Sequence, residues 1–175
     1  CQGTCPLDTA NVVAAARRVQ SAGLAGRVVF LSITVDPARD TRPRLAAYRR
    51  LYAPAPANWL TLTGSTAVLN GLWNRLGVYR KQAPEVGPAP RDWLTDKPLT
   101  YDITHSDQVF FLDGRGHKRF QLDGAPHVAR GAALPARIRS FLSAEGTRGL
   151  AHADGAAWTL QQALQVLSWL LDKRL

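Results

Sequence analysis

The chain has 175 residues, 46% of them hydrophobic and 20% charged, which suits one globular domain and excludes a collagen-like, low-complexity or disordered protein. No stretch approaches the roughly 18 apolar residues of a membrane-spanning helix, and two cysteines are too few for a disulfide scaffold. The net charge of +9 is scattered along the chain without a basic run or interleaved aromatic residues, so no nucleic-acid partner is expected.

The first half of the chain alternates predicted helices and strands. Cys5-Pro6 is a typical helix start, because proline is tolerated in the first turn, and this helix is predicted to end at Gly23. The β-branched run 28–35 predicts a strand buried on both faces, and WLTLT over 59–63 predicts a second strand. One helix is expected between these strands, and another over 65–77.

The second half begins with an irregular segment. Residues 82–98 are rich in proline and charge, so we expect a loop there, with at most a short hairpin and no chemistry. Two apolar runs, 108–113 and 118–123, flank the glycine-containing turn 114–116 and predict a β-hairpin. A helix over 134–144 is expected to close the main body.

The end of the chain is predicted to form a separate unit. Small and polar residues over 145–157 are typical of a linker, and the leucines that follow at a 4-3-4 spacing predict an amphipathic helix. We therefore divide the chain into a domain over residues 1–145 and a linker with a C-terminal helix over 146–175. Strands separated by helices, then a hairpin and a helix, predict the α/β class, a sheet with helices on its faces.

Three side chains are candidates for chemistry: Cys1, Cys5 and His105. Two thiols four residues apart can reach one point, and the helix N-terminus is expected to lower the pKa of the second thiol. Such a pair cycles between dithiol and disulfide, holds a soft metal ion, or forms an inert structural disulfide. His105 precedes a predicted strand, where loops often carry function. Two thiolates and an imidazole suit copper, whereas a structural zinc site would take a fourth protein ligand.

Four segments of the chain occur in a familiar order. They are CQGTCP at 1–6, the segment SITVDP at 32–37 followed by RDT at 39–41, WLTLTG at 59–64, and THS at 104–106 ahead of an apolar strand. In this order they resemble the SCO/SenC family of copper chaperones, with its CxxxCP motif, its S-x-x-x-D-P-x-R-D-T segment and its late histidine. The resemblance covers residues 1–145.

This resemblance implies a thioredoxin-like sheet with flanking helices, in which the family's strand leading into CxxxCP has no counterpart in the sequence. It implies that Cys1, Cys5 and His105 are metal ligands for Cu(I) or Cu(II). The implied function is that of a metallochaperone, not an enzyme, which takes copper from a donor protein and delivers it to the binuclear copper site of cytochrome c oxidase. The C-terminal helix has no counterpart in the minimal family fold.

Other functions stay open at this point. A thiol–disulfide oxidoreductase would use Cys1 and Cys5 as a redox pair acting on the cysteines of the oxidase, with His105 incidental. A peroxidase would need a T-x-x-C loop that the sequence does not show. A binding module with a structural disulfide would change only its stability on reduction. A copper-loading dithiol is expected outside the cytoplasm, in the bacterial periplasm or on the outer face of the membrane, with any membrane attachment through an anchor upstream of residue 1.

Overall fold

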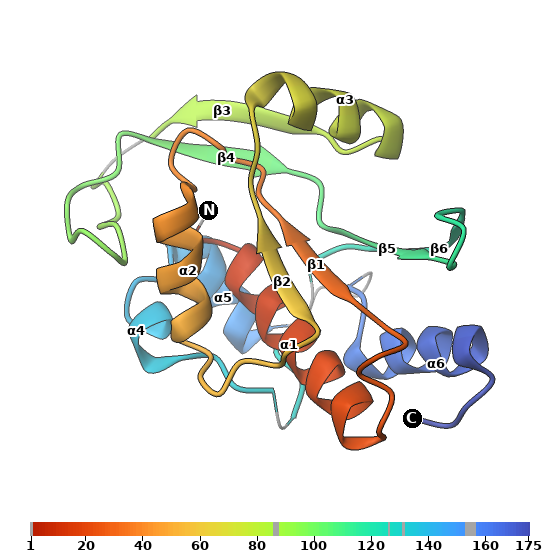
Figure 1. Cartoon of the computed structure of the whole chain (residues 1–175). Helices are drawn as coiled ribbons and strands as arrows, with labels where there is room; N and C mark the ends of the chain where they lie inside the picture. Colours follow the sequence, from red (N-terminus) through yellow and green to blue (C-terminus); the bar gives the residue numbers. More distant parts are fainter. Residues whose placement is uncertain (1, 86–87, 126, 131, 153–156) are drawn as a thin grey trace.

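A computed structural model of the chain describes residues 2–85, 88–125, 127–130, 132–152 and 157–175. Within these residues the protein belongs to the α/β class: helices surround three two-stranded sheets (Figure 1). None of the helices in the described part combines the length and the apolar character needed to cross a bilayer. The α/β class predicted from the sequence is therefore present, with its strands divided among small sheets.

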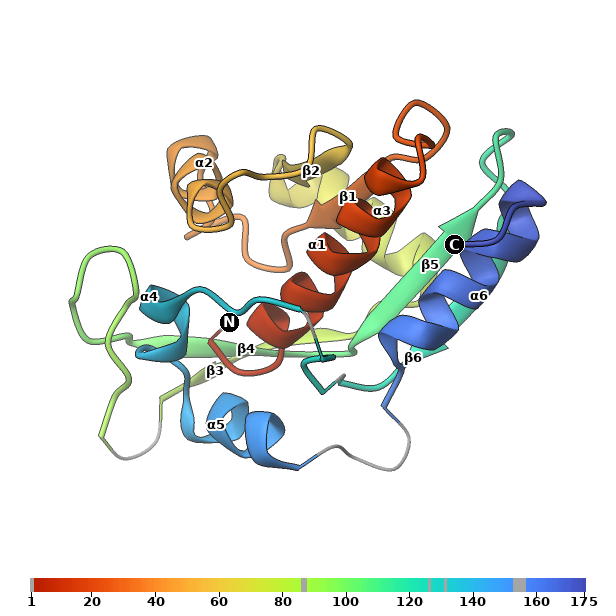
Figure 2. The same cartoon turned by 90° about the horizontal axis from the view of Figure 1, so that it is seen from below.

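Helix α1 (Cys5–Ser21) is the central helix of the core and confirms the first predicted helix. Proline occupies its first turn, and Leu7, Val13 and Val19 on its length are fully buried. Figures 1 and 2 show strands β1 and β2 on one side of α1 and the C-terminal helices on another. The helix thus carries its first residue, Cys5, into the middle of the molecule.

Strands β1 (Phe30–Ile33) and β2 (Trp59–Leu62) are parallel and in register, and helix α2 (Arg42–Arg50) connects them. The prediction of a strand buried on both faces was wrong, because Leu31 is 48% exposed and Leu60, its register partner, is 43% exposed. A β-branched run reports strand propensity but does not reveal what covers each face. Here α1 covers one face only.

A cavity of about 890 Å³ lies beside β1, and its lining includes β1, β5 (Gln108–Leu112) and the start of α1. Within the described residues, β1 pairs only with β2, and β5 pairs only with β6 (Lys118–Asp123). In the described part of the chain, the cavity therefore lies between strands that are not hydrogen-bonded to each other. The β5–β6 hairpin itself was predicted, and Gly116 takes the positive φ that its turn requires.

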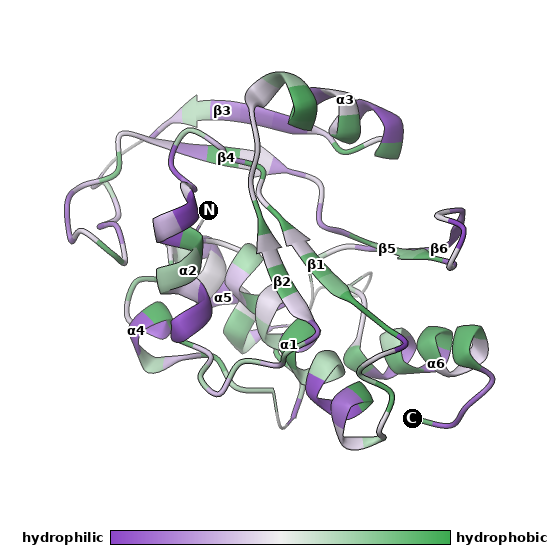
Figure 3. Cartoon of the chain, viewed as in Figure 1, coloured by the Kyte–Doolittle hydropathy of each residue, from purple (hydrophilic) through white to green (hydrophobic). Residues whose placement is uncertain are grey.

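Helix α3 (Thr66–Leu76) matches its prediction, since the Ser65 side chain caps its start and Gly77 ends it in the left-handed conformation. The next segment differs from its prediction. Strand β3 (Arg80–Pro84) pairs antiparallel with β4 (Tyr101–His105), so residues 82–84 are not loop. Figure 3 shows that β3 is mainly hydrophilic, and a strand of such polar residues lacks the apolar alternation by which strands are recognised.

The C-terminal region was predicted least well. The helix expected over 134–144 is only α4 (Ala136–Arg139), and the following α5 (Ala144–Ala151) occupies half of the expected linker. The Ser143 side chain caps α5 by accepting a hydrogen bond from Gly146 N at 3.3 Å, so a new helix begins where the linker was expected.

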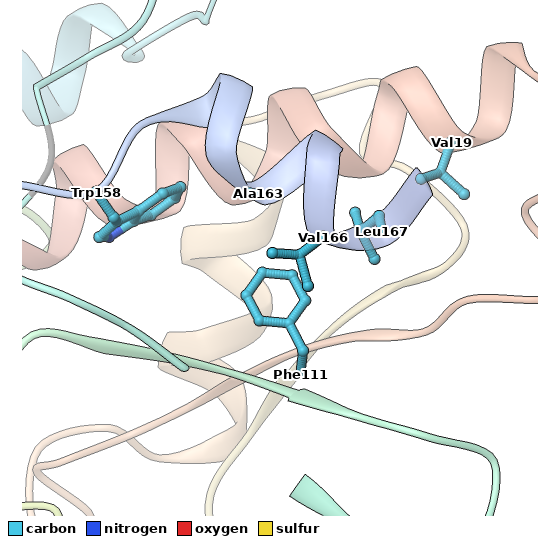
Figure 4. Packing of buried hydrophobic residues seen from close by; sticks show 6 residues of the cluster. All are labelled: Val19, Phe111, Trp158, Ala163, Val166 and Leu167. Carbon is cyan, nitrogen blue, oxygen red and sulfur yellow. The ribbon is translucent and has the colours of Figure 1, made fainter. Parts of the chain in front are cut away.

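Helix α6 (Leu160–Leu171) confirms the predicted amphipathic helix, and a capping box of Thr159 and Gln162 starts it. Its Val166 and Leu167 pack against Phe111 of β5 and against α1 in one hydrophobic cluster (Figure 4). Figure 2 shows α6 lying along β5 and β6. The division into units over 1–145 and 146–175 remains a prediction.

Candidate metal centre

Two of the three predicted site residues are in contact. Cys5 Sγ lies 2.9 Å from His105 Nε2, although the residues are 100 positions apart in the sequence. Cys5 is the first residue of α1, and His105 is the last residue of β4. Cys1 lies outside the described residues, and within those described no group of three or more His, Cys, Asp or Glu side chains is placed to hold a metal ion.

The tautomer of His105 follows from its second hydrogen bond. His105 Nδ1 lies 3.1 Å from the carbonyl oxygen of Ser106, and a carbonyl only accepts, so Nδ1 carries the proton. In the neutral ring this leaves the Nε2 lone pair facing Cys5 Sγ. The side chain of His105 is 7% exposed. The ring is thus held ready to accept the thiol proton or to bind a metal ion that replaces it.

The environment of Cys5 overturns one expectation. The residue is half-buried, and the loss of water around its thiol raises the pKa of Cys5. The nearby carboxylates of Asp8 and Asp107 raise this pKa further. The predicted lowering by the helix N-terminus was therefore wrong, because desolvation outweighs the dipole here. Without a metal ion, Cys5 is a protonated thiol at neutral pH.

We expect the raised pKa to suppress the reactivity of Cys5. In a Cys1→Ser variant, where Cys5 is the one remaining thiol, alkylation by iodoacetamide at pH 8 should be at least about tenfold slower than that of free cysteine, whose pKa is about 8.5. The rate should keep rising above pH 9, since the thiolate forms only there. The same variant in urea should react like free cysteine, and a rate in the folded protein that levels off below pH 8 would contradict this account.

A buried ionic network fixes the strand that carries His105. The Tyr101 hydroxyl, at the start of β4, donates to Asp36 Oδ1 at 3.1 Å, and Arg39 Nη1 donates to the Tyr101 carbonyl at 3.0 Å. Arg39 also forms an ion pair with Asp36, which is 2% exposed. Asp36 and Arg39 belong to the segment over 32–41, for which the sequence predicts no separate role. Their role is to hold the loop after β1 against β4.

The segment between the cysteines is held by two regions for which the sequence predicts no function, residues 82–98 and 145–157. Gln2 is buried; its Nε2 donates to the Arg91 carbonyl at 2.9 Å, and its Oε1 accepts from Trp93 N at 3.0 Å. A Cβ on Gly146 of α5 would lie 2.7 Å from the carbonyl oxygen of Gly3, so only glycine fits there. Long-range contacts of this kind leave no local sequence signal.

Two carboxyl groups, those of Asp8 and Asp107, lie near the Cys5–His105 pair. Thr4 Oγ1 donates to Asp107 Oδ1 at 2.8 Å, and the same oxygen is 3.7 Å from His105 Nδ1. Burial first, and the hydrogen-bonded neighbour Asp107 next, raise the pKa of Asp8. The Asp8 carboxyl therefore retains its proton at a pH where isolated aspartates are ionised. The site thus combines the thiol of Cys5 and the imidazole of His105 with the neighbouring carboxyl groups of Asp8 and Asp107.

The chain is similar to known proteins in sequence and in fold. A family model described as SCO1/SenC matches residues 1–138. Among solved structures, the chain is similar to that of Bradyrhizobium japonicum ScoI with copper bound, at 20% identity and a TM-score of 0.51, over 81% of this chain and 78% of that one. It is also similar to a SCO1/SenC family lipoprotein from Bacillus anthracis str. Ames, at 19% identity and a TM-score of 0.53, over 81% and 73%. These likenesses confirm the predicted thioredoxin-like fold. No curated protein sequence matches the chain.

Proposed function

Because the chain belongs to the SCO1/SenC family, we propose that it is a metallochaperone that binds copper through Cys1, Cys5 and His105. The observation that carries the proposal is the 2.9 Å contact between Cys5 Sγ and His105 Nε2. Thiolate and imidazole are the donors that a Cu(I) site in proteins prefers, and imidazole also accommodates Cu(II). The similar ScoI structure that contains copper supports this choice of metal.

The geometry supplies a proton balance for metal binding. The metal ion takes the place of the thiol proton between Cys5 Sγ and His105 Nε2, and that proton leaves to solvent. The imidazole binds through Nε2 without losing a proton, because its own proton sits on Nδ1 beside the Ser106 carbonyl. Copper uptake therefore releases protons from the thiols only, and it becomes tighter as the pH rises.

The proposed destination is the binuclear copper site of cytochrome c oxidase. The mechanism is ligand exchange: a thiolate of the recipient displaces one of the three ligands while the other two retain the ion. A copper donor protein and the copper-bearing subunit of the oxidase are the proposed partners. The proposed compartment is extracytoplasmic, with a tether upstream of residue 1, and the similarity to a lipoprotein of the family supports it.

A thiol–disulfide oxidoreductase is the competing function. Exchange needs an attacking thiolate, and a thiol of high pKa is also a poor leaving group. The raised pKa of Cys5 therefore favours a metal site over a fast redox site. The two functions differ in what they transfer: one passes on a copper ion, and the other passes on two electrons.

Copper transfer to a soluble copper-bearing domain of the oxidase subunit should separate them. Protein loaded with one Cu(I) is mixed with the reduced, copper-free domain, the two are separated, and copper is measured in each. We expect most of the copper to move to the domain, since its thiolates complete the ligand exchange.

The control offers the copper-free, reduced protein to the same domain in its disulfide form and counts the thiols that appear there. If that disulfide is reduced and no copper moves in the first experiment, the proposed function changes from copper chaperone to oxidoreductase. The copper-loaded His117→Ala variant should transfer copper like wild type, because the side chain of His117 is 70% exposed in the β5–β6 turn.

A further inference from the structure

Trp158 belongs to the part of the chain beyond the family match, yet it reaches toward the candidate metal centre. The match ends at residue 138, and Trp158 lies just before α6. Its side chain is 2% exposed and packs in the cluster of Val19, Phe111 and α6 shown in Figure 4. Its one polar atom, Nε1, donates to Asp8 Oδ1 at 3.0 Å. A buried indole N–H normally finds a hydrogen-bond acceptor. If Trp158 served packing alone, any nearby acceptor would satisfy it.

The acceptor, however, connects to the site. Asp8 lies one helical turn after Cys5 on α1 and is hydrogen-bonded to Asp107. Asp107 Oδ1 in turn lies 3.7 Å from His105 Nδ1 and accepts from Thr4 Oγ1 at 2.8 Å. Asp8, Asp107 and Trp158 line the same cavity as Cys5 and His105. Asp8 and Asp107 therefore link the indole to the imidazole, and the last step is the 3.7 Å approach of Asp107 Oδ1 to His105 Nδ1.

We propose that Trp158 is a positioning residue for the Cys5–His105 pair, acting through Asp8 and Asp107. This inference rests on the proposed copper function. The indole N–H fixes the Asp8 carboxyl against Asp107, and Asp107 stays beside the Nδ1 side of the His105 ring. The ring then keeps Nε2 aimed at Cys5 Sγ. Partners of this kind behind a metal-binding histidine orient the ring and tune the metal, and their loss weakens metal binding about 10–100-fold.

The C-terminal region thus serves the metal centre of this chain as well as packing on its core. Trp158 lies just before α6 and belongs to the same hydrophobic cluster as Val166 and Leu167 of α6 and Phe111 of β5. Removal of the indole N–H, with the ring volume largely kept, should therefore change the site before it changes the fold. This difference separates a positioning role from a role in packing.

The test compares Trp158→Phe with Trp169→Phe, a matched change at a 60% exposed tryptophan of α6. Cu(I) affinity is measured by competition with a chromogenic chelator, and the thiolate-to-copper charge-transfer band of the Cu(II) form is recorded. We expect Trp158→Phe to bind Cu(I) at least about tenfold more weakly and to shift the band. Trp169→Phe should do neither. Wild-type affinity and an unshifted band in Trp158→Phe would overturn the proposal.

A second pair of variants leaves the indole in place. Asp8→Ala breaks the same chain of contacts, so we expect a similar loss of affinity and no further loss in the double variant with Trp158→Phe. Asp8→Asn keeps an acceptor for the indole and a group facing Asp107, so it should bind copper like wild type. Full additivity of the two losses, or wild-type affinity in Asp8→Ala, would overturn the proposal even if Trp158→Phe proved unstable.

The copper-free protein supplies an independent measurement. The ¹⁵N chemical shifts of the His105 ring report which nitrogen is protonated; we expect Nδ1 in wild type and in Trp169→Phe, and a mixture of tautomers in Trp158→Phe. Identical ring shifts in Trp158→Phe and wild type would overturn the proposal. If wild-type protein binds no copper while the ring still responds to Trp158→Phe, the proposed function fails and the positioning role stands.

Discussion

Replacement of His105 by alanine is expected to weaken Cu(I) binding by the reduced protein by more than about 100-fold, beyond the 10–100-fold that the loss of an outer partner causes. The reason is that His105 Nε2 is the one imidazole nitrogen placed against Cys5 Sγ in the described part of the chain, at 2.9 Å. Competition with a Cu(I) chelator measures the affinity. A thiol reagent should still count two thiols in urea, because the variant retains both cysteines.

A matched control distinguishes the ligand from a general effect of losing a histidine. His127→Ala removes an exposed imidazole that lies in the segment after β6 and contacts the Gly149 carbonyl, not Cys5. This control should bind Cu(I) with wild-type affinity. If His105→Ala binds Cu(I) with unchanged affinity, His105 is not a copper ligand. The candidate site is then a dithiol that holds metal or exchanges disulfides.

Replacement of Trp59 by alanine is expected to lower the free energy of unfolding by about 3–5 kcal/mol. Trp59 is fully buried in the cluster that joins β2 to α1, where Val13 and Ala16 surround it. Its ring also meets Tyr52 edge to face at 5.4 Å, and its Nε1 donates to Ser32 Oγ at 3.0 Å. The variant leaves a large cavity and an unpaired hydroxyl beneath the parallel pair.

Urea unfolding of Trp59→Ala and Trp169→Ala measures this effect against a matched control. Trp169 is 60% exposed, so its loss should lower the free energy of unfolding by less than about 1 kcal/mol. A domain of this size is commonly stable by about 5–15 kcal/mol, so the core variant should lie close to unfolding. A loss below about 1 kcal/mol for Trp59→Ala would mean that the cluster is not a core.

The parts of the fold that were predicted correctly carry local signals. Helix α1 has a proline in its first turn, which marks its start. Helix α3 lies between Ser65 and Gly77, which mark its two ends. The hairpin of β5 and β6 is marked by its glycine turn. Strand β3 carries no such mark, and its pairing with β4 depends on partners that are 17 (Pro84 with Tyr101) to 25 (Arg80 with His105) residues away along the chain. The burial of β1 likewise depends on distant elements.

The candidate site divides in the same way. Cys5 and His105 were proposed from motifs, but their contact spans 100 residues and no periodicity predicts it. The direction of the Cys5 pKa was predicted wrongly, because the dipole is a local property whereas desolvation depends on the surrounding fold. The contact of Trp158 with Asp8 spans 150 residues and was not predicted at all. The role of Cys1 stays a prediction, since it lies outside the described residues.

An anaerobic Cu(I) titration of the reduced protein, with Cys5→Ser beside it, tests the central claim most directly. The account predicts that wild-type protein binds one Cu(I) per chain and that Cys5→Ser loses this binding, because Cys5 Sγ is the thiol in contact with His105 Nε2. Retention of the one-to-one binding in Cys5→Ser, or no binding by wild-type protein, would contradict the assignment of this pair as a copper site.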